Sequence, residues 1–138
     1  MARRLIFDTG VFVDAERGKL DPADLHNDED DVTITAVTVA ELVAGVYMAD
    51  ERNRARRQRF VEDVRRTFGV MEFDERVAEV HGELLAFARR SGRPRGTLDL
   101  IVAATAVANR RVLVTTDARA RFDGLPGLDV EVVGRQER

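Results

Sequence analysis

The fold class is decided by residues 98–117, which read LDLIVAATAVANRRVLVTTD and combine a helix with a strand. The segment 98–108 is apolar nearly all round and rich in alanine, which is typical of a helix buried inside a protein. The segment 112–115 is a short apolar run and predicts a buried strand. A buried helix followed by a buried strand is typical of an α/β protein with a parallel sheet.

The same alternation of strands and helices runs through the rest of the chain. Four further apolar or β-branched stretches predict strands at 5–7, 32–35, 70–73 and 130–133. Helices or helical turns are predicted at 11–18, 22–25, 38–46, 51–68, 74–90 and 117–122. We therefore predict an α/β fold, a three-layer α/β/α sandwich around a parallel sheet of about five strands.

The length of 138 residues and the composition limit the kinds of protein this can be. The length suits one domain, predicted to span residues 1–134, with a short tail at 135–138. The absence of cysteine excludes disulfides, zinc–thiolate sites and iron–sulfur clusters, and two histidines are too few for a histidine-rich metal site. No apolar run approaches the roughly 20 residues that cross a bilayer, and no signal peptide is visible, so we expect a cytoplasmic protein.

Charge is unevenly distributed along the chain, although the formal net charge is only −3. Residues 21–31 contain six acids and neither lysine nor arginine, and we interpret this stretch, 28–31 above all, as a solvated loop. Residues 51–68 contain seven arginines and three acids, a local net charge of +4. Such a run is usually a solvated helix face, and contact with RNA or a protein partner is the functional alternative.

Four acids are expected to meet at one edge of the predicted sheet. Asp8 follows the first strand, Asp117 follows the fourth, Glu41 lies one helical turn after the second, and Asp99 begins the buried helix. In open parallel sheets, ligands bind outside the carboxyl ends of the strands, near the point where the strand order reverses. These four side chains are therefore the candidates for the chemistry of the protein.

Each of these acids also has a purely structural explanation. Asp8 suits a turn or cap, Glu41 suits a capping box that begins at Thr38, and an acid in the first turn complements a helix dipole. Taken together, however, carboxylates about 4 Å apart repel by about 4 kcal/mol at an effective dielectric near 20. A divalent cation reverses that repulsion, and an all-oxygen set of ligands suits Mg²⁺ or Mn²⁺.

Four sequence blocks resemble the PIN-domain ribonucleases, specifically the VapC toxins of bacterial toxin–antitoxin pairs. The blocks are IFDT at 6–9, VAEL at 39–42, LDLIVAA at 98–104 and LVTTD at 113–117, and Phe122 matches as well. The resemblance covers essentially the whole chain. It departs at Gly10, where the family often has serine or asparagine after the threonine, and this departure affects a hydrogen bond around the acids but removes no acid.

The resemblance implies a single PIN domain that acts as an Mg²⁺-dependent endoribonuclease toxin and hydrolyses phosphodiester bonds in RNA. It implies that the catalytic, metal-holding residues are Asp8, Glu41, Asp99 and Asp117. Of these, Asp8 and Asp99 are expected to bind the metal directly, while Glu41 and Asp117 act through water or a weaker second ion. The candidates to orient the carboxylates are Thr9, Thr115 and Thr116.

The expected partners follow from the same resemblance. They are an RNA substrate, a VapB-like antitoxin and a second copy of the chain in a homodimer, with no membrane contact. An acidic site repels RNA, so cations must attract it, and Arg93 and Arg95 in the loop before Asp99 are the candidates.

Two alternatives stay open at the level of sequence. A non-catalytic PIN-like binding module would have the same fold, although all four acids are present here. A phospho-acceptor receiver domain is also α/β with an acidic Mg²⁺ pocket, but it needs paired acids after the first strand and a lysine near the end. The chain has a single acid there, and its only lysine is Lys19.

Overall fold

The structure is a computed structural model that describes residues 2–117 and 122–134. Five strands in this part of the chain form one sheet, and every neighbouring pair is parallel. They are β1 (Arg4–Phe7), β2 (Asp31–Thr35), β3 (Gly69–Met71), β4 (Val112–Thr115) and β5 (Val130–Val132). The predicted parallel sheet of about five strands is thereby confirmed.

The strand order is β3-β2-β1-β4-β5, so β1 lies at the centre and the order reverses beside it. Strands β2 and β3 lie on one side of β1, and β4 and β5, which come later in the sequence, lie on the other side. Ile6 of β1 therefore pairs with Thr33 on one side and with Leu113 on the other. The carboxyl ends of β1 and β4 border the position where open parallel sheets bind ligands.

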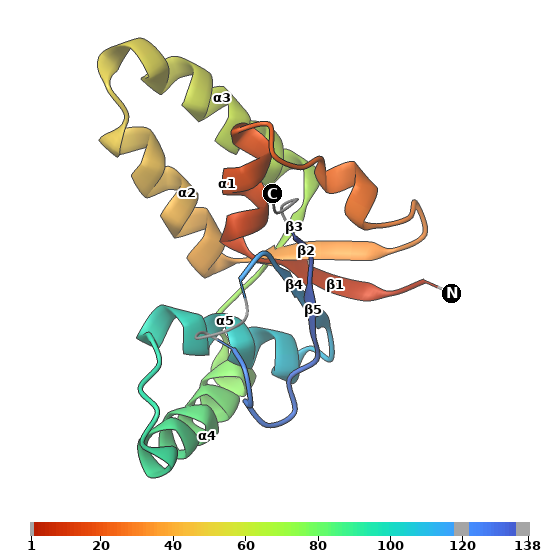
Figure 1. The fold of residues 1–138 in the computed structure, drawn as a ribbon, viewed down its shortest axis with the longest axis vertical. Helices are drawn as coiled ribbons and strands as arrows, with labels where there is room; N and C mark the ends of the chain where they lie inside the picture. The colour runs from red at the N-terminus through yellow and green to blue at the C-terminus, as the bar shows by residue number, and fades with distance from the viewer. Residues whose placement is uncertain (1, 118–121, 135–138) are drawn as a thin grey trace.

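Three helices cover one face of the sheet, as the upper part of Figure 1 shows: α1 (Thr9–Glu16), α2 (Ala36–Met48) and α3 (Glu51–Thr67). Leu5 and Phe7 of β1 and Val114 of β4 pack into this layer. They meet the buried side chains of α2 and α3, among them Leu42 and Val61. The alternation of side chains along a strand sends these residues to one face and their neighbours to the other.

Two helices cover the opposite face, α4 (Glu75–Ser91) and α5 (Thr97–Ala108). Ile6 and Leu113 pack against them, and the largely alanine surface of α5 lets that helix lie close to the sheet. The predicted three-layer α/β/α sandwich is confirmed (Figure 1). No helix in the described residues is both long enough and apolar enough to cross a membrane.

Most predicted element boundaries agree with the structure. The Asp74 carboxylate accepts a hydrogen bond from the Val77 N–H at 2.9 Å and so begins α4, and Gly92, with φ at 68°, ends it. The predicted short helix near 22–25 is a 3-10 turn, η1 (Pro22–Leu25), capped by Asp21. The predicted helical turn at 117–122 and the tail at 135–138 fall largely or wholly outside the described residues.

The beginning of α2 corrects the predicted capping box. Thr35, the last residue of β2, is the N-cap, and its hydroxyl accepts from the Thr38 N–H at 3.1 Å. The capping box from Thr38 to Glu41 is therefore wrong, because β2 runs directly into α2 and the helix begins earlier than the sequence pattern indicates. Glu41 is an exposed residue in the middle of the helix instead.

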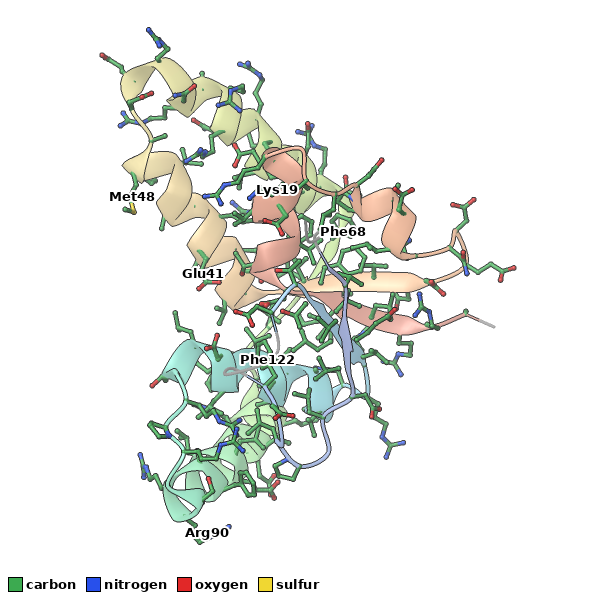
Figure 2. All side chains as sticks on the ribbon, viewed as in Figure 1. Lys19, Glu41, Met48, Phe68, Arg90 and Phe122 are labelled. Atoms are coloured by element: carbon green, nitrogen blue, oxygen red, sulfur yellow. The ribbon has the colours of Figure 1, made fainter. Side chains whose placement is uncertain are left out.

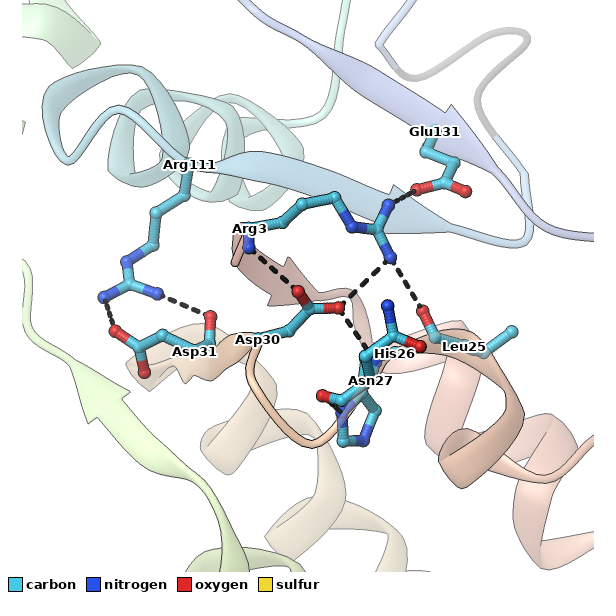
Figure 3. A network of polar contacts seen from close by, with 8 residues as sticks. All are labelled: Arg3, Leu25, His26, Asn27, Asp30, Asp31, Arg111 and Glu131. Carbon is cyan, nitrogen blue, oxygen red and sulfur yellow. Dashed lines mark hydrogen bonds and ion pairs between the residues drawn. The ribbon is translucent and has the colours of Figure 1, made fainter. Parts of the chain in front are cut away.

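The amino ends of the strands are joined by the ion pairs that Figure 3 shows. The Asp30 side chain is buried and accepts from the Arg3 N–H at 2.8 Å and the Asn27 N–H at 2.9 Å. The buried Arg111 guanidinium donates to the Asp31 carboxylate at 2.8 Å. The interpretation of 28–31 as a solvated loop is thus wrong for Asp30, whose buried side chain pairs with Arg3. Asp31 is exposed, but it begins β2 and pairs with Arg111.

Asp30 makes the stability of this end depend on pH. The hydrogen bonds from the Asn27 and Arg3 N–H groups, with the Arg3 charge, hold the pKa of Asp30 below 3.8 and outweigh its burial. A lowered folded-state pKa stabilises the protein above the unfolded pKa of about 3.9, and this contribution is lost as pH falls through the folded pKa. We expect Asp30→Asn to lower the melting temperature at pH 7, with a difference from the wild type that shrinks toward pH 3.

Asp28→Asn is the matched control, because Asp28 is an exposed acid of the same loop. It should have little effect at any pH. A difference between Asp30→Asn and the wild type that stays constant from pH 7 to pH 3 in thermal denaturation would contradict this assignment.

Candidate active site

Asp8 lies directly after the central strand, where the strand order reverses, and its side chain is buried. Its N–H donates to the Val114 carbonyl at 2.9 Å, which continues the β1–β4 pairing by one residue. The Thr115 hydroxyl donates to Asp8 Oδ2 at 2.8 Å. Asp8 is also the N-cap of α1 but makes no side-chain cap hydrogen bond, so the backbone of α1 does not occupy its carboxylate.

Thr115 connects Asp8 with Asp117. Besides donating to Asp8, its hydroxyl accepts from the Asp117 N–H at 3.2 Å. Thr115 is fully buried at the end of β4, whereas Asp117 is exposed. One hydroxyl therefore fixes the orientation of the first acid and the backbone position of the second.

Glu41 is held by a different threonine. The Thr9 hydroxyl donates to Glu41 Oε1 at 2.5 Å and also lies 2.9 Å from the hydroxyl of the buried Thr38. These bonds join the first turn of α1 to the first half of α2. Figure 2 shows Glu41 in the turns of α2 that lie nearest the sheet.

Asp99 lies in the first turn of α5 and is half-buried. Its Oδ2 lies 3.2 Å from where a Cβ at Gly96 would be, so the carboxylate folds back toward the start of the helix. Helix α5 contacts β4, the strand that Asp117 follows, and it also contacts α2, the helix that carries Glu41. In Figure 1, α2 and α5 both begin at the end of the sheet where β1 and β2 finish.

Hydrogen bonds connect Asp8 with Asp117 through Thr115, and Glu41 with α1 through Thr9, while Asp99 is placed by its helix. In residues 2–117 and 122–134, no three Asp, Glu or His side chains form a ready-made metal cage. Mg²⁺ is usually held by one or two carboxylates and several waters, so the oxygen donors of these acids are chemically suited to it. Mn²⁺ accepts the same oxygen ligands.

Thr116, the third predicted orienting threonine, lies against Gly10. A Cβ at Gly10 would be only 2.5 Å from the Thr116 hydroxyl oxygen. The glycine that departs from the family pattern therefore coincides with a close approach of the segment after β4.

Arg93 and Arg95, the predicted RNA contacts, lie against the segment 122–125. The Arg95 guanidinium donates to the Asp123 carbonyl at 2.8 Å, and Arg93 Nη1 lies 3.6 Å from where a Cβ at Gly124 would be. Arg95 is thus partly engaged in holding two loops together, whereas Arg93 is exposed.

Sequence reasoning missed a cavity of about 160 Å³ beside Glu41, between α1, α2 and α3. Thr9 and Glu41 line one side of it, and Glu16 and Arg57 line the other. Arg57 Nε donates to Glu16 Oε2 at 3.0 Å, and its Nη1 donates to the Gly45 carbonyl at 3.3 Å. No sequence pattern relates Glu16 to Arg57, which is 41 residues further on.

The fold and these residues agree with a known family. Residues 5–127 match the model of the PIN domain, and the chain belongs to this family. Membership of the PIN-domain family excludes the alternative that the chain is a phospho-acceptor receiver domain.

Two sequence relatives within the PIN-domain family are both named as VapC ribonucleases. Ribonuclease VapC4 of Mycobacterium tuberculosis is 31% identical over 131 residues, 95% of this chain and 96% of that protein. Ribonuclease VapC of Rickettsia bellii is 28% identical over 130 residues, 94% of this chain and 96% of that protein. The predicted resemblance to VapC proteins is thereby confirmed.

Solved structures agree with the sequence relatives. A member of the VapBC family of toxin–antitoxin systems from M. tuberculosis, VapBC-5, superposes with a TM-score of 0.77 at 31% identity, covering 94% of this chain and 98% of that chain. VapBC2 from Rickettsia felis, bound to a DNA fragment from its promoter, has a TM-score of 0.85 at 22% identity over 94% of this chain and 98% of that chain. The second likeness concerns the fold alone.

The Thr115 hydroxyl is expected to contribute measurably to stability. Thr115→Val keeps the shape of the side chain but removes the donor to the buried Asp8 carboxylate and the acceptor for the Asp117 N–H. We expect the free energy of unfolding in urea at pH 7 to fall by about 1–3 kcal/mol. Thr115→Ser keeps the hydroxyl, so its free energy of unfolding should fall by less. A Thr115→Val protein as stable as the wild type would show that these hydrogen bonds do not stabilise the fold.

Because Thr35 is the N-cap of α2, its side chain should contribute to the free energy of unfolding. Thr35→Ala removes the N-cap acceptor and should lower the free energy of unfolding by about 1 kcal/mol. Glu41→Ala should change it by no more than about 0.5 kcal/mol, because Glu41 is exposed and alanine favours helices. Equal losses for the two variants in urea denaturation would restore the capping-box interpretation.

Proposed function

We propose that this chain is a divalent-metal-dependent endoribonuclease and the toxin of a toxin–antitoxin pair. The observation that carries the proposal is the buried Asp8 carboxylate at the carboxyl end of the central strand, held by Thr115 next to Asp117. Membership of the PIN-domain family and the VapC relatives, which are named ribonucleases, support it. We take residues 1–134 as a single PIN domain and 135–138 as a tail.

We further propose that the metal is Mg²⁺, with Mn²⁺ as a substitute. Asp8 and Asp99 would bind it, and Glu41 and Asp117 would support its hydration shell. When bound, the ion would activate water and neutralise charge on the phosphate and the leaving oxygen.

The hydroxyl groups hold the carboxylates in place for this task. Thr115 donates to Asp8 and Thr9 donates to Glu41, so a hydroxyl group restrains each of these two carboxylates. Fixing the orientation of a ligand in this way is the usual role of residues that surround a metal site. Both threonines are thus proposed as orienting residues.

RNA must be attracted by cations outside the acidic centre. The exposed Arg93 is the better of the two loop candidates, because Arg95 already donates to the Asp123 carbonyl. On α3, Arg52 and Arg59 are exposed as well, whereas Arg57 is engaged by Glu16. We also propose that the protein acts in the cytoplasm, on the RNA of the cell.

The proposed protein partners are a VapB-like antitoxin and a second copy of the chain. Several structural neighbours are complexes of this kind, including VapBC-5 and FitAcB from Neisseria gonorrhoeae. Tyr47 and Met48 at the end of α2 are 76% and 84% exposed, an apolar surface that a partner would cover.

The acids give the direct test. Asp8→Asn and Asp99→Asn remove a charged ligand each, and we expect either variant to lose RNA cleavage in the presence of Mg²⁺ by about 100-fold or more. Circular dichroism checks that each variant folds. Asp28→Asn, which changes an exposed acid in the loop before the amino end of β2, should cleave as well as the wild type.

The rate of cleavage of a fluorescent RNA with and without EDTA is the measurement. Full activity of both folded variants, or activity of the wild type that resists EDTA, would refute the proposed metal site.

A further inference from the structure

Three consecutive residues at the start of α1 each contact a different part of the site. Asp8 accepts from Thr115, and Thr9 donates to Glu41. Gly10 is the third, since the Thr116 hydroxyl oxygen lies 2.5 Å from where its Cβ would be. The first turn of α1 is therefore in contact with α2 on one side and with the segment after β4 on the other.

The backbone of Gly10 does not require glycine. Gly10 lies inside α1, and it is absent from the glycines with positive φ in the described part of the chain. Glycine inside a helix is destabilising relative to alanine, because it loses more conformational freedom on folding. The glycine is explained by the close approach of Thr116, which any side chain at position 10 would push away.

Of the three threonines predicted to orient the carboxylates, Thr116 is the one whose hydroxyl hydrogen is still available to bond a ligand. Thr115 and Thr9 already donate to carboxylates. Among residues 2–117 and 122–134, the half-buried Thr116 hydroxyl forms no hydrogen bond. It directly precedes Asp117 and lies over the turn that begins at Asp8.

We propose that the Thr116 hydroxyl donates a hydrogen bond to a phosphate oxygen of the RNA during cleavage, and that Gly10 is the positioning residue that seats it. The carboxylates of the site are acceptors, so a negatively charged phosphate needs donors from other residues. The Thr116 hydroxyl, which lies against Gly10 in the first turn of α1 and directly precedes Asp117 in the chain, supplies one. This inference rests on the proposed ribonuclease function and adds a substrate contact to it.

The first variant removes only the donor. Thr116→Val keeps the branched shape, and we expect kcat for a fluorescent RNA to fall about 10- to 100-fold, as for loss of a hydrogen bond to a charged group. The KM and the Mn²⁺ affinity measured by calorimetry should stay within about threefold, because the contact strengthens in the transition state. Thr116→Ser keeps the hydroxyl and should retain at least about a third of the wild-type kcat.

The second pair of variants tests the position of the hydroxyl. Gly10→Ala should displace Thr116 and lower kcat as Thr116→Val does, while the melting temperature stays at or near that of the wild type. The double variant Gly10→Ser with Thr116→Ala moves the hydroxyl from position 116 to position 10, on the other side of the same contact. It should recover part of the kcat that Thr116→Val loses. Thr67→Val, which removes an exposed hydroxyl that bonds the Asp63 carbonyl on α3, is the matched control and should leave kcat unchanged.

The outcomes separate this inference from the proposed function. If the wild type cleaves RNA and Asp8→Asn does not, but Thr116→Val matches the wild type, the inference is wrong and the function stands. A loss of activity in Thr116→Val that comes with weaker Mn²⁺ binding or a lower melting temperature also overturns it, since the role is then structural. Equal cleavage by the wild type and Asp8→Asn would refute both.

Discussion

The structure depends on the burial of one carboxylate at the end of the central strand. Asp8 is 0% exposed, and taking an ionised carboxylate out of water costs several kcal/mol unless other groups stabilise it. The Thr115 hydroxyl supplies one such bond, and the Asp8 N–H extends the β1–β4 pairing. A fold selected for stability alone would place an apolar or neutral residue there, so the carboxylate indicates function.

The two ends of the sheet treat their acids differently. At the amino ends of the strands, Asp30 and Asp31 face the guanidinium groups of Arg3 and Arg111, which neutralise them and bind the strands together (Figure 3). At the carboxyl end, threonine hydroxyls donate hydrogen bonds to Asp8 and Glu41 and so orient these two carboxylates. The ion pairs at the amino end stabilise the fold, and the oriented acids at the carboxyl end are the proposed ligands of a cation.

Local patterns in the sequence were sufficient for the fold. The apolar strands, the buried helix over 98–108 and the cap at Asp74 all depend on residues near each other in the chain, and each is present in the structure. The capping box at Thr38 failed because a strand that continues directly into a helix moved the N-cap to Thr35. The signature was present in the sequence, but the preceding strand decided its register.

The contacts that fix the candidate site could not be predicted from local patterns. The Thr115–Asp8 bond joins residues 107 apart, and the Arg57–Glu16 bond joins residues 41 apart. The acids themselves were found because parallel strands bring their carboxyl ends to one edge. Their partners depend on which helix face packs against which strand, and this emerges only from the assembled fold.

Anomalous diffraction from crystals grown with Mn²⁺ will show whether Asp8 holds a divalent cation. We expect an anomalous peak with an Asp8 carboxylate oxygen as a ligand at about 2.1 Å, with the other site acids around it. Ordered Mn²⁺ found only on the acidic surface of residues 21–31, or no peak beside Asp8 at millimolar Mn²⁺, would show that Asp8 is not a metal ligand.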